Sequence, residues 1–304
     1  MSSVQALGND TIQSQNIFGQ PLAIFGVPVD REKIFTNYKG VYKSRVEKRQ
    51  RKLIVKSTFI KFFLHHGETI QCLTTGYSPL SVKEQMLTGL AFLYFRRALF
   101  VITEKRILHI PTRFNRSPRG AVSQILFEDC ARIEVKGRAL HVQYKNGRQE
   151  VFPYLGRKEK KKVRALLSKL SLSPKEAGQL KGRVYLCPSC THALPAGSAL
   201  CGTCNLAFKS TFKTRLYSLL VPGGGYFYGR YAFVGAGAAL FELCLMAILV
   251  WKGMEMHKGL PVDLNLMIVP ALALLLEKFI MAFHTERLLE DYVPEKSDYA
   301  VRKI

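Results

Sequence analysis

The chain has 304 residues, with 45 Lys and Arg against 22 Asp and Glu, so its formal net charge is +23. At about 100–200 residues per domain, this length allows one or two globular domains. The charge favours an anionic partner, either a membrane surface or a nucleic acid.

Two basic segments supply most of this charge. Residues 31–61 contain 11 Lys and Arg against two acidic residues, and residues 157–183 contain 10 against two. No Ser/His/Asp set, paired-carboxylate site or phosphate loop is recognisable, and Gly223–Gly225 lacks the Lys-Ser/Thr that follows a phosphate loop. We therefore expect a protein that is not an enzyme.

The first 66 residues are interpreted as an N-terminal arm. Met1–Gln20 lacks the basic-then-apolar pattern of a cleavable secretion signal, and the polar stretch Ser2–Asn16 is expected to be disordered. Ile17–Val29 is apolar but interrupted by Gly and Pro, which suggests an arm lying on another surface. Lys33–Phe63 is typical of a basic amphipathic helix, which would bind a membrane surface or pack on its own domain.

Residues 67–170 have the composition of a β-rich domain. Many short strands and one closing helix over Arg157–Leu170 predict a small barrel or bent sheet, and Asn146-Gly147 is a strong hairpin signal. The apolar insertion Leu80–Tyr94 predicts a short helix against the membrane or the helical hairpin. Strands are expected over Glu68–Tyr77, Ala98–Ile110 (a hairpin), Ala121–Glu128, Cys130–Val135, Ala139–Tyr144 and Gln149–Tyr154.

Within this domain, the phrase FVITEKRILHI with its Thr-x-x-Arg hairpin, the stretch ILFEDCARIEVKGRALHVQY and the final helix resemble the bacterial PH and GRAM-type domains of the pleckstrin-homology-like superfamily. This resemblance implies a PH-like β barrel with a C-terminal helix, which binds lipid headgroups or a protein partner. In the loop Thr112–Gly120, Arg113, Arg116 and Arg119 are candidate ligand-binding residues, because a guanidinium can donate two hydrogen bonds to one phosphate. A plain solvated loop is the alternative.

The strongest motif pairs Cys187 with Cys190 and, after ten residues, Cys201 with Cys204. Two residues between paired cysteines let both thiolates hold one ion from a single turn, and two such turns complete the tetrahedral set that zinc prefers. We predict a zinc ribbon with a structural Zn(II), because four thiolates leave no position for a reacting water. Iron and ligation by His192 are the alternatives. The remaining cysteines are expected to be buried thiols: Cys72, Cys130 and Cys244.

Two apolar runs near the C-terminus are typical of a transmembrane hairpin. Ala232–Trp251 has 20 residues and Leu266–Phe283 has 18, which at about 1.5 Å per residue matches a hydrocarbon core of about 30 Å. A buried soluble hairpin is the alternative. Only Lys252 and Lys258 lie between the runs, while more Lys and Arg flank them, so we expect both termini on the cytoplasmic side of a bacterial inner membrane.

The stretch from Ser218 to Arg230 is similar to the Pro-Gly-x-Gly-x-Phe-Tyr-x-Gly entrance of small two-helix membrane domains in many bacterial proteins. Its Pro and Gly residues would break an interfacial segment from the first span. Inside the runs lie Glu242, Glu277 and Lys278. A charge at the bilayer centre costs about 3 kcal/mol, so Glu242 must be protonated, paired, with Lys278 as a plausible partner, or facing a polar cavity.

These features predict a multidomain membrane protein that acts as a non-enzymatic adaptor, with an anionic lipid, a protein partner or a second copy of itself as its partner. An accessory subunit of a transporter or channel, working through Glu242 and Glu277, is one alternative. A membrane-tethered nucleic-acid-binding protein is another. The expected organisation is an arm (1–66), a PH-like domain (67–170), a basic linker (171–183), a zinc ribbon (184–208), the hairpin (209–285) and a cytoplasmic tail (286–304).

Overall fold

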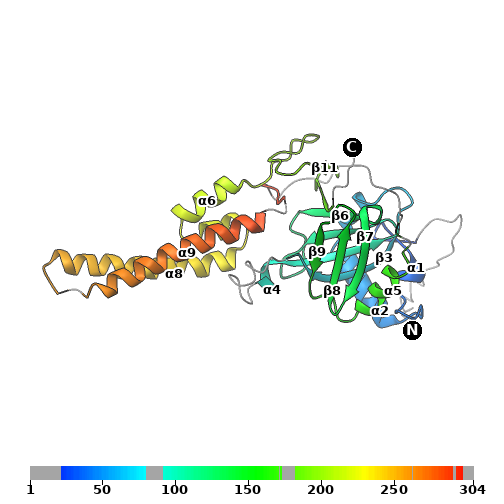
Figure 1. Cartoon of the computed structure of the whole chain (residues 1–304), viewed down its shortest axis with the longest axis horizontal. Coiled ribbons are helices and arrows are strands. Elements are labelled where there is room, and N and C mark those ends of the chain that lie inside the picture. Colours follow the sequence, from blue (N-terminus) through cyan, green and yellow to red (C-terminus); the bar gives the residue numbers. More distant parts are fainter. Residues whose placement is uncertain are drawn as a thin grey trace, which may run out of the picture.

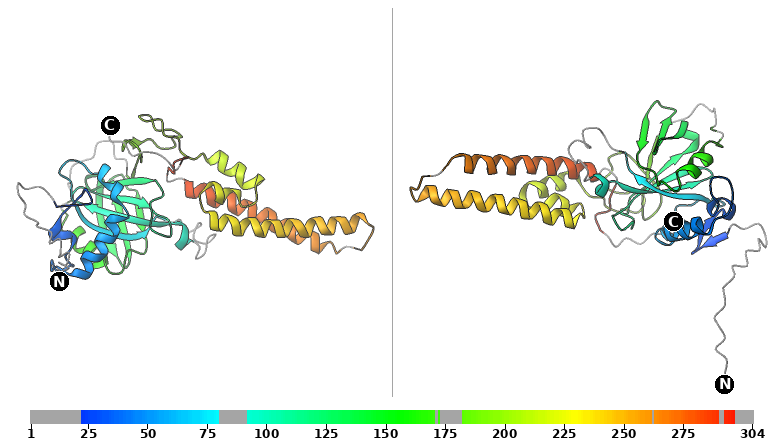
Figure 2. Two further views of the ribbon diagram at one scale, coloured as in Figure 1. Left: turned by 180° about the vertical axis from the view of Figure 1, so that it is seen from behind. Right: turned by 90° about the horizontal axis from the view of Figure 1, so that it is seen from below.

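The computed structural model describes residues 22–79, 92–170, 172, 182–261, 263–289 and 292–296. A β-rich domain lies at one end, and a long bundle of helices projects from it (Figure 1). Two further views agree with this arrangement (Figure 2). Several expectations lie wholly or largely outside the described residues: those for Met1–Gln20, Ser2–Asn16, the insertion Leu80–Tyr94, the linker 171–183 and the tail 286–304.

The β-rich domain contains two sheets. The larger one has the order β1-β2-β3-β4-β5-β6-β10-β11, and the smaller one has the order β7-β8-β9. An antiparallel meander forms the centre of the larger sheet: β3 (Ile70–Tyr77), β4 (Arg97–Thr103), β5 (Arg106–Pro111) and β6 (Val122–Leu126). The smaller sheet comprises β7 (Cys130–Lys136), β8 (Ala139–Tyr144) and β9 (Gln149–Phe152), and helix α5 (Lys160–Leu167) follows it.

The predicted strands and closing helix are thus present. Of the two predicted forms, a small barrel or a bent sheet, the barrel is not closed. Among the described residues, no strand of the smaller sheet pairs with the larger one. The short 3₁₀ turn η3 (Phe127–Asp129) ends β6 and redirects the chain into β7. The sheets instead share a core, in which Phe100, Phe152 and Val163 are fully buried.

The N-terminal segment belongs to this domain. Strands β1 (Leu22–Ile24) and β2 (Val27–Val29) extend the larger sheet, with Val29 opposite Ile70. The long helix expected over Lys33–Phe63 is broken into α1 (Arg31–Ile34), α2 (Ser44–Val55) and the 3₁₀ turn η1 (Thr58–Phe62). Leu53 and Ile54 of α2 are buried in the core under the larger sheet. This segment therefore packs on its own domain, the second of the two alternatives considered.

The Thr and Arg side chains of the Thr-x-x-Arg hairpin bind other residues of the same domain. Thr103 Oγ1 donates to Glu68 at 2.7 Å, and Arg106 forms a buried ion pair with the same carboxylate at 2.7 Å. Arg106 also donates to the Phe63 carbonyl at 2.6 Å. Burial alone would raise the pKa of Glu68, but hydrogen bonds from Arg106, the His65 backbone N–H and Thr103 hold it below its usual value. The network therefore ties the β4–β5 turn to the segment before β3.

The cysteine-rich segment continues the larger sheet. Strand β10 (Val184–Leu186) pairs with β6, and β11 (Ala193–Leu194) pairs with β10. On its other side the segment meets the C-terminal residues, where Phe208 and Pro294 form a β-bridge. The segment is therefore joined to the β-rich domain by backbone hydrogen bonds.

The helical bundle consists of α6 (Thr211–Leu220), α7 (Gly224–Tyr228), α8 (Ala232–His257) and α9 (Asn265–Leu289). Helices α8 and α9 are long and apolar enough to cross a membrane, and only 11% and 6% of their most apolar windows are buried. The helices of a buried soluble hairpin would be mostly buried, so the low buried fraction of α8 and α9 argues against that alternative. Cys244 lies exposed on α8, whereas Cys72 and Cys130 are buried, so the expectation for Cys244 is wrong.

Candidate functional sites

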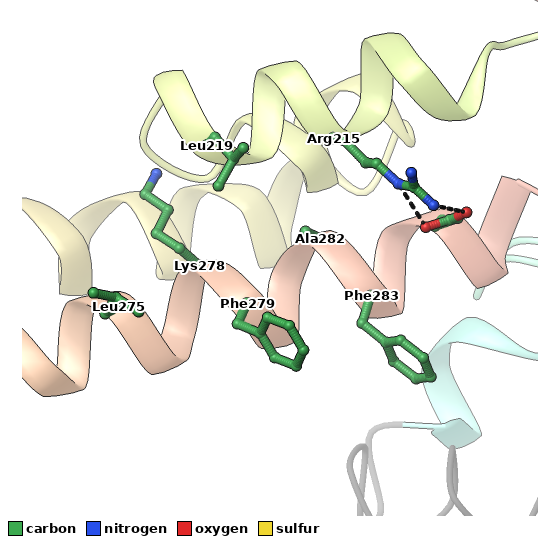
Figure 3. Close-up of a pocket in the computed structure, with 8 residues that line it drawn as sticks. Arg215, Leu219, Leu275, Lys278, Phe279, Ala282 and Phe283 are labelled. Atoms are coloured by element: carbon green, nitrogen blue, oxygen red, sulfur yellow. Dashed lines mark hydrogen bonds and ion pairs between the residues drawn. The ribbon is translucent and has the colours of Figure 1, made fainter.

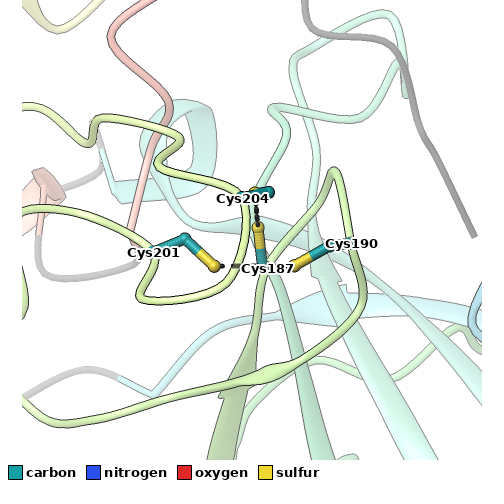
Figure 4. A group of neighbouring side chains, drawn as sticks. All are labelled: Cys187, Cys190, Cys201 and Cys204. Atoms are coloured by element: carbon teal, nitrogen blue, oxygen red, sulfur yellow. Dashed lines mark hydrogen bonds between the residues drawn. The ribbon is translucent and has the colours of Figure 1, made fainter. Parts of the chain in front are cut away.

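The four paired cysteines form one cluster (Figure 4). Their sulfur atoms all lie within 4.8 Å of one another, with Cys187 Sγ 3.5 Å from Cys204 Sγ and Cys190 Sγ 3.5 Å from Cys201 Sγ. A tetrahedral zinc ion with Zn–S bonds of about 2.3 Å needs sulfurs about 3.8 Å apart. The sulfur spacing therefore fits a four-coordinate metal such as zinc.

Two equivalent turns build this cluster. The Thr191 N–H donates to the Cys187 carbonyl, and the Asn205 N–H donates to the Cys201 carbonyl, both at 2.9 Å. Thr191 and Asn205 have left-handed backbones, with φ of 64° and 56°, so each turn closes directly after its second cysteine. This repetition brings both pairs of thiols to one point.

Backbone N–H groups stabilise the thiolate of Cys201, whereas burial raises the pKa of Cys187 and of Cys190. Burial acts to raise the pKa of Cys201, but hydrogen bonds from the Cys204 and Thr203 backbones outweigh it and lower this pKa to about 6. His192 lies outside the cluster, and its Nδ1 is 3.2 Å from the Cys190 carbonyl. The four thiols are thus placed where they could hold one metal ion such as zinc, and His192 is not among them.

The cluster lies where three parts of the chain meet. Its apolar surroundings include Leu194 and Phe208, and Tyr292 from the C-terminal residues packs against them. The Tyr292 hydroxyl donates to the Pro195 carbonyl at 2.7 Å. Helix α6 begins three residues after Phe208. A metal here would therefore fix the β-rich domain, the C-terminal residues and the start of the bundle relative to one another.

The candidate ligand-binding loop, Thr112–Gly120, lies beside the start of α8. Arg119 is buried, and its guanidinium lies 4.1 Å from the centre of the Tyr231 ring. It donates hydrogen bonds to the Tyr231 hydroxyl and, at 3.2 Å, to the Gly229 carbonyl. Arg119 therefore holds the β-rich domain against the bundle, and it is not open to a ligand.

The other two arginines of the loop are exposed. Arg113 and Arg116 flank Phe114, which is 62% exposed. The Phe114 ring is stacked on Tyr94, and Arg97 lies over it at 4.5 Å. The loop thus presents two cations and an aromatic ring at the end of the domain nearest the helices.

The junction beside this loop is aromatic and positively charged. Phe95, at the end of α4 (Phe92–Phe95), packs edge-on against Tyr231 at 4.8 Å and against His284 at 4.6 Å. Lys209 lies 4.6 Å from the centre of the Tyr228 ring. Burial, together with the charges of Arg230 and Arg119, lowers the pKa of Lys209 to about 8. Sequence reasoning did not identify Lys209 or Tyr231, since neither belongs to a recognisable motif.

The glycines of the Pro222–Gly225 turn each meet a different part of the bundle. A Cβ on Gly223 would lie 2.1 Å from the Gly235 carbonyl oxygen of α8, and a Cβ on Gly224 would lie 2.2 Å from the Tyr217 carbonyl oxygen of α6. A Cβ on Gly225 would meet the hydroxyls of Ser218 and Thr285. Helices α6 and α7 therefore form a short second hairpin, packed tightly against α8 and α9.

Glu242 and Lys278 satisfy the backbone at this turn. The Gly223 N–H donates to Glu242 Oε1 at 3.0 Å, and Lys278 donates to the Val221 carbonyl at 3.3 Å. The Lys278 ammonium lies 2.5 Å from Glu242 Oε2, and Glu242 is completely buried. Buried backbone N–H and C=O groups outside a helix need hydrogen-bond partners of this kind. These charges therefore have a structural task.

Glu277 is the third polar group in this region. Its carboxyl interacts with that of Glu242. Its Oε2 atom is shielded from solvent and has no hydrogen-bond partner in the part of the chain that the structure describes. One ammonium and two carboxyl groups are electrically neutral when they hold one proton between them.

No family model, curated protein or solved structure matches the chain. The sites therefore rest on the geometry given above.

Proposed function

We propose that the protein is a membrane-anchored, non-enzymatic adaptor. Helices α8 and α9 cross the membrane, and the PH-like domain with its fused zinc ribbon lies on the cytoplasmic face. There the exposed loop residues Arg113, Phe114 and Arg116 contact anionic lipid headgroups. The contact of this loop with Tyr231, the residue just before α8, is the observation that carries the proposal.

The geometry supports the proposed lipid contact in two ways. Tyr231 immediately precedes α8, and aromatic residues at the ends of membrane helices lie at headgroup level. Since Arg119 fixes the loop to Tyr231, Arg113 and Arg116 of the same loop would also lie near the level of the lipid headgroups. Each basic residue near an anionic surface contributes about 1 kcal/mol.

The order of elements supports the PH-like assignment. Four antiparallel strands, β3 to β6, are followed by three more, β7 to β9, and then by helix α5. The resemblance implies the same order of strands and closing helix. A protein partner for the remaining basic surface of the domain, such as the exposed face of α2, is part of the proposal.

The lipid contact can be tested with a tryptophan reporter in the full-length chain. The sequence contains one Trp, so Trp251→Phe gives a silent background to which Phe114→Trp is added. In membranes with phospholipids brominated near the headgroup, we expect this reporter to be quenched. Quenching should be stronger with anionic than with zwitterionic lipid, and weaker at high salt.

Phe25→Trp in the same background is the matched control. Phe25 is 65% exposed and lies in the β1–β2 turn, near the start of β3, whereas Arg97, which lies over the Phe114 ring, pairs with the opposite end of β3. We expect it to remain unquenched, and replacement of Arg113 and Arg116 by Gln to remove the anionic preference of Phe114→Trp. Equal signals from both reporters would contradict the proposal. Shielding of Phe114→Trp by duplex DNA at the same salt would favour a nucleic-acid partner instead.

The arrangement of Glu277 favours a second candidate, an accessory subunit of a transporter or channel. Its shielded carboxyl beside Glu242 could hold a proton inside the bundle. In this case Glu277→Gln would change ion or proton flux while membrane insertion and lipid contact stay intact. If flux is unchanged and the Phe114→Trp quenching is retained, the adaptor proposal stands alone.

A further inference from the structure

A groove lies between α6 and α9 (Figure 3). Its volume is about 460 Å³, within the range of about 300–1,000 Å³ that is typical of small-molecule sites. The walls are mainly apolar and include Leu219, Leu275 and Phe279, which are 58%, 70% and 70% exposed.

The two ends of the groove differ in character. At the end of the groove near Leu275, Lys278 is held by Glu242 and by the Val221 carbonyl. At the end near the β-rich domain, Arg215 Nε and Nη2 donate to Glu286 at 3.0 and 2.7 Å. Arg215 remains 61% exposed, and its Nη1 makes no hydrogen bond within the described residues. The groove thus runs from an exposed guanidinium into an apolar channel.

We propose that this groove binds a membrane phospholipid, with one acyl chain between α6 and α9 and the phosphate on Arg215. The inference rests on the proposed membrane insertion of α8 and α9, but it does not depend on the loop at Arg113. From Glu286 to Leu275, α9 rises about 16 Å at 1.5 Å per residue. This is about half of the 30 Å hydrocarbon core, the depth of one leaflet.

Charge also favours a phosphate at the mouth. A guanidinium has five N–H donors, so Arg215 can hold a phosphate oxygen with Nη1 while its other nitrogens stay on Glu286. Lys209, Lys213 and Arg230 lie on the segments around this end of the bundle, and only Lys213 of these forms an ion pair with a described acidic side chain, Glu295. An anionic headgroup is therefore preferred to a neutral one.

The test uses the full-length chain, delipidated in mild detergent and then given phosphatidylglycerol or phosphatidylcholine. Bound lipid is counted by native mass spectrometry. We expect one bound phosphatidylglycerol, which Ala282→Trp displaces by filling the groove. Ala271→Trp is the control, because Ala271 is exposed on the same helix outside the groove. Equal lipid binding by both variants overturns the proposal.

A second pair of variants separates headgroup binding from a structural role of the ion pair. Arg215→Gln should weaken lipid binding about tenfold, the loss expected for one charge-assisted hydrogen bond. Glu286→Gln, which frees Arg215, should bind at least as tightly as the wild type. Equal losses of lipid binding in both variants would mean that the Arg215–Glu286 ion pair is only structural, which contradicts phosphate binding by Arg215. A dimer that carries no lipid and dissociates with Ala282→Trp would place a second copy in the groove, also overturning the proposal.

If Phe114→Trp is not quenched but this lipid is bound, the proposed function fails and the groove site stands. The reverse pattern removes the groove site alone.

Discussion

Substitution of Gly223 by Ala tests the short α6–α7 hairpin directly. Gly223 has φ of +63°, a conformation that costs a residue with a side chain roughly 1–2 kcal/mol. The added Cβ would also lie 2.1 Å from the Gly235 carbonyl oxygen, which belongs to the backbone of α8 and cannot rotate away. Overpacking of this kind costs about 1–3 kcal/mol. We therefore expect Gly223→Ala to lower the free energy of unfolding by about 2–5 kcal/mol.

Gly237→Ala is the matched control on α8. A Cβ on Gly237 meets nothing within 4 Å, and Ala is favoured over Gly in a helix by about 1 kcal/mol, so this variant should be neutral or slightly more stable. The free energy of unfolding can be measured in mixed micelles as the fraction of denaturing detergent is raised. If Gly223→Ala and Gly237→Ala unfold at the same detergent fraction, the close packing of the turn against α8 is refuted.

Three further outcomes follow from the other sites. Cys190→Ser should lose bound zinc while His192→Ala keeps it, and elemental analysis at falling pH should show zinc released as the thiolates are protonated; zinc lost from both variants would contradict a four-cysteine site. Arg119→Ala should destabilise the contact between the β-rich domain and the helical bundle by about 1–3 kcal/mol, which would be measured as faster amide hydrogen exchange around Tyr231. Arg116→Ala, at an exposed position, should leave this exchange unchanged. The pKa of Glu68 is lowered in the folded protein, so its ionised carboxylate stabilises the fold at pH values above the unfolded pKa of about 4.3, and this stabilisation is lost as pH falls through the folded pKa. Glu68→Gln should flatten the dependence of the unfolding free energy on pH in this range. An unchanged pH dependence would argue against the buried ion pair of Glu68 and Arg106.

Much of the β-rich domain could be predicted from the sequence, because alternating apolar residues and Asn146-Gly147 are local signals. The same holds for the two long apolar helices and for the paired cysteines. The open arrangement of the two sheets was not predictable in this way, since it depends on how η3 turns the chain between β6 and β7.

The candidate sites could be predicted less well from the sequence, because they depend on tertiary contacts. Nothing local distinguishes Arg119 from Arg113 and Arg116, and only the position of Tyr231 buries the first and leaves the others exposed. The turn at Gly223 could have been inferred more fully, because three consecutive glycines indicate close backbone approaches. The bond between Gly223 and Glu242 joins residues 19 apart, and no spacing rule reveals it.

Protease protection in oriented membrane vesicles tests the central claim, that α8 and α9 cross the membrane with the β-rich domain on the cytoplasmic side. Lys252 near the end of α8 and Lys258 just after it provide cleavage sites, and Trp251 makes the protected fragment visible by fluorescence. In inside-out vesicles we expect trypsin to remove the β-rich domain and leave Lys252 and Lys258 intact, and right-side-out vesicles should give the reverse. Cleavage of the domain and of Lys252 and Lys258 in the same sealed vesicles would contradict a membrane-spanning hairpin.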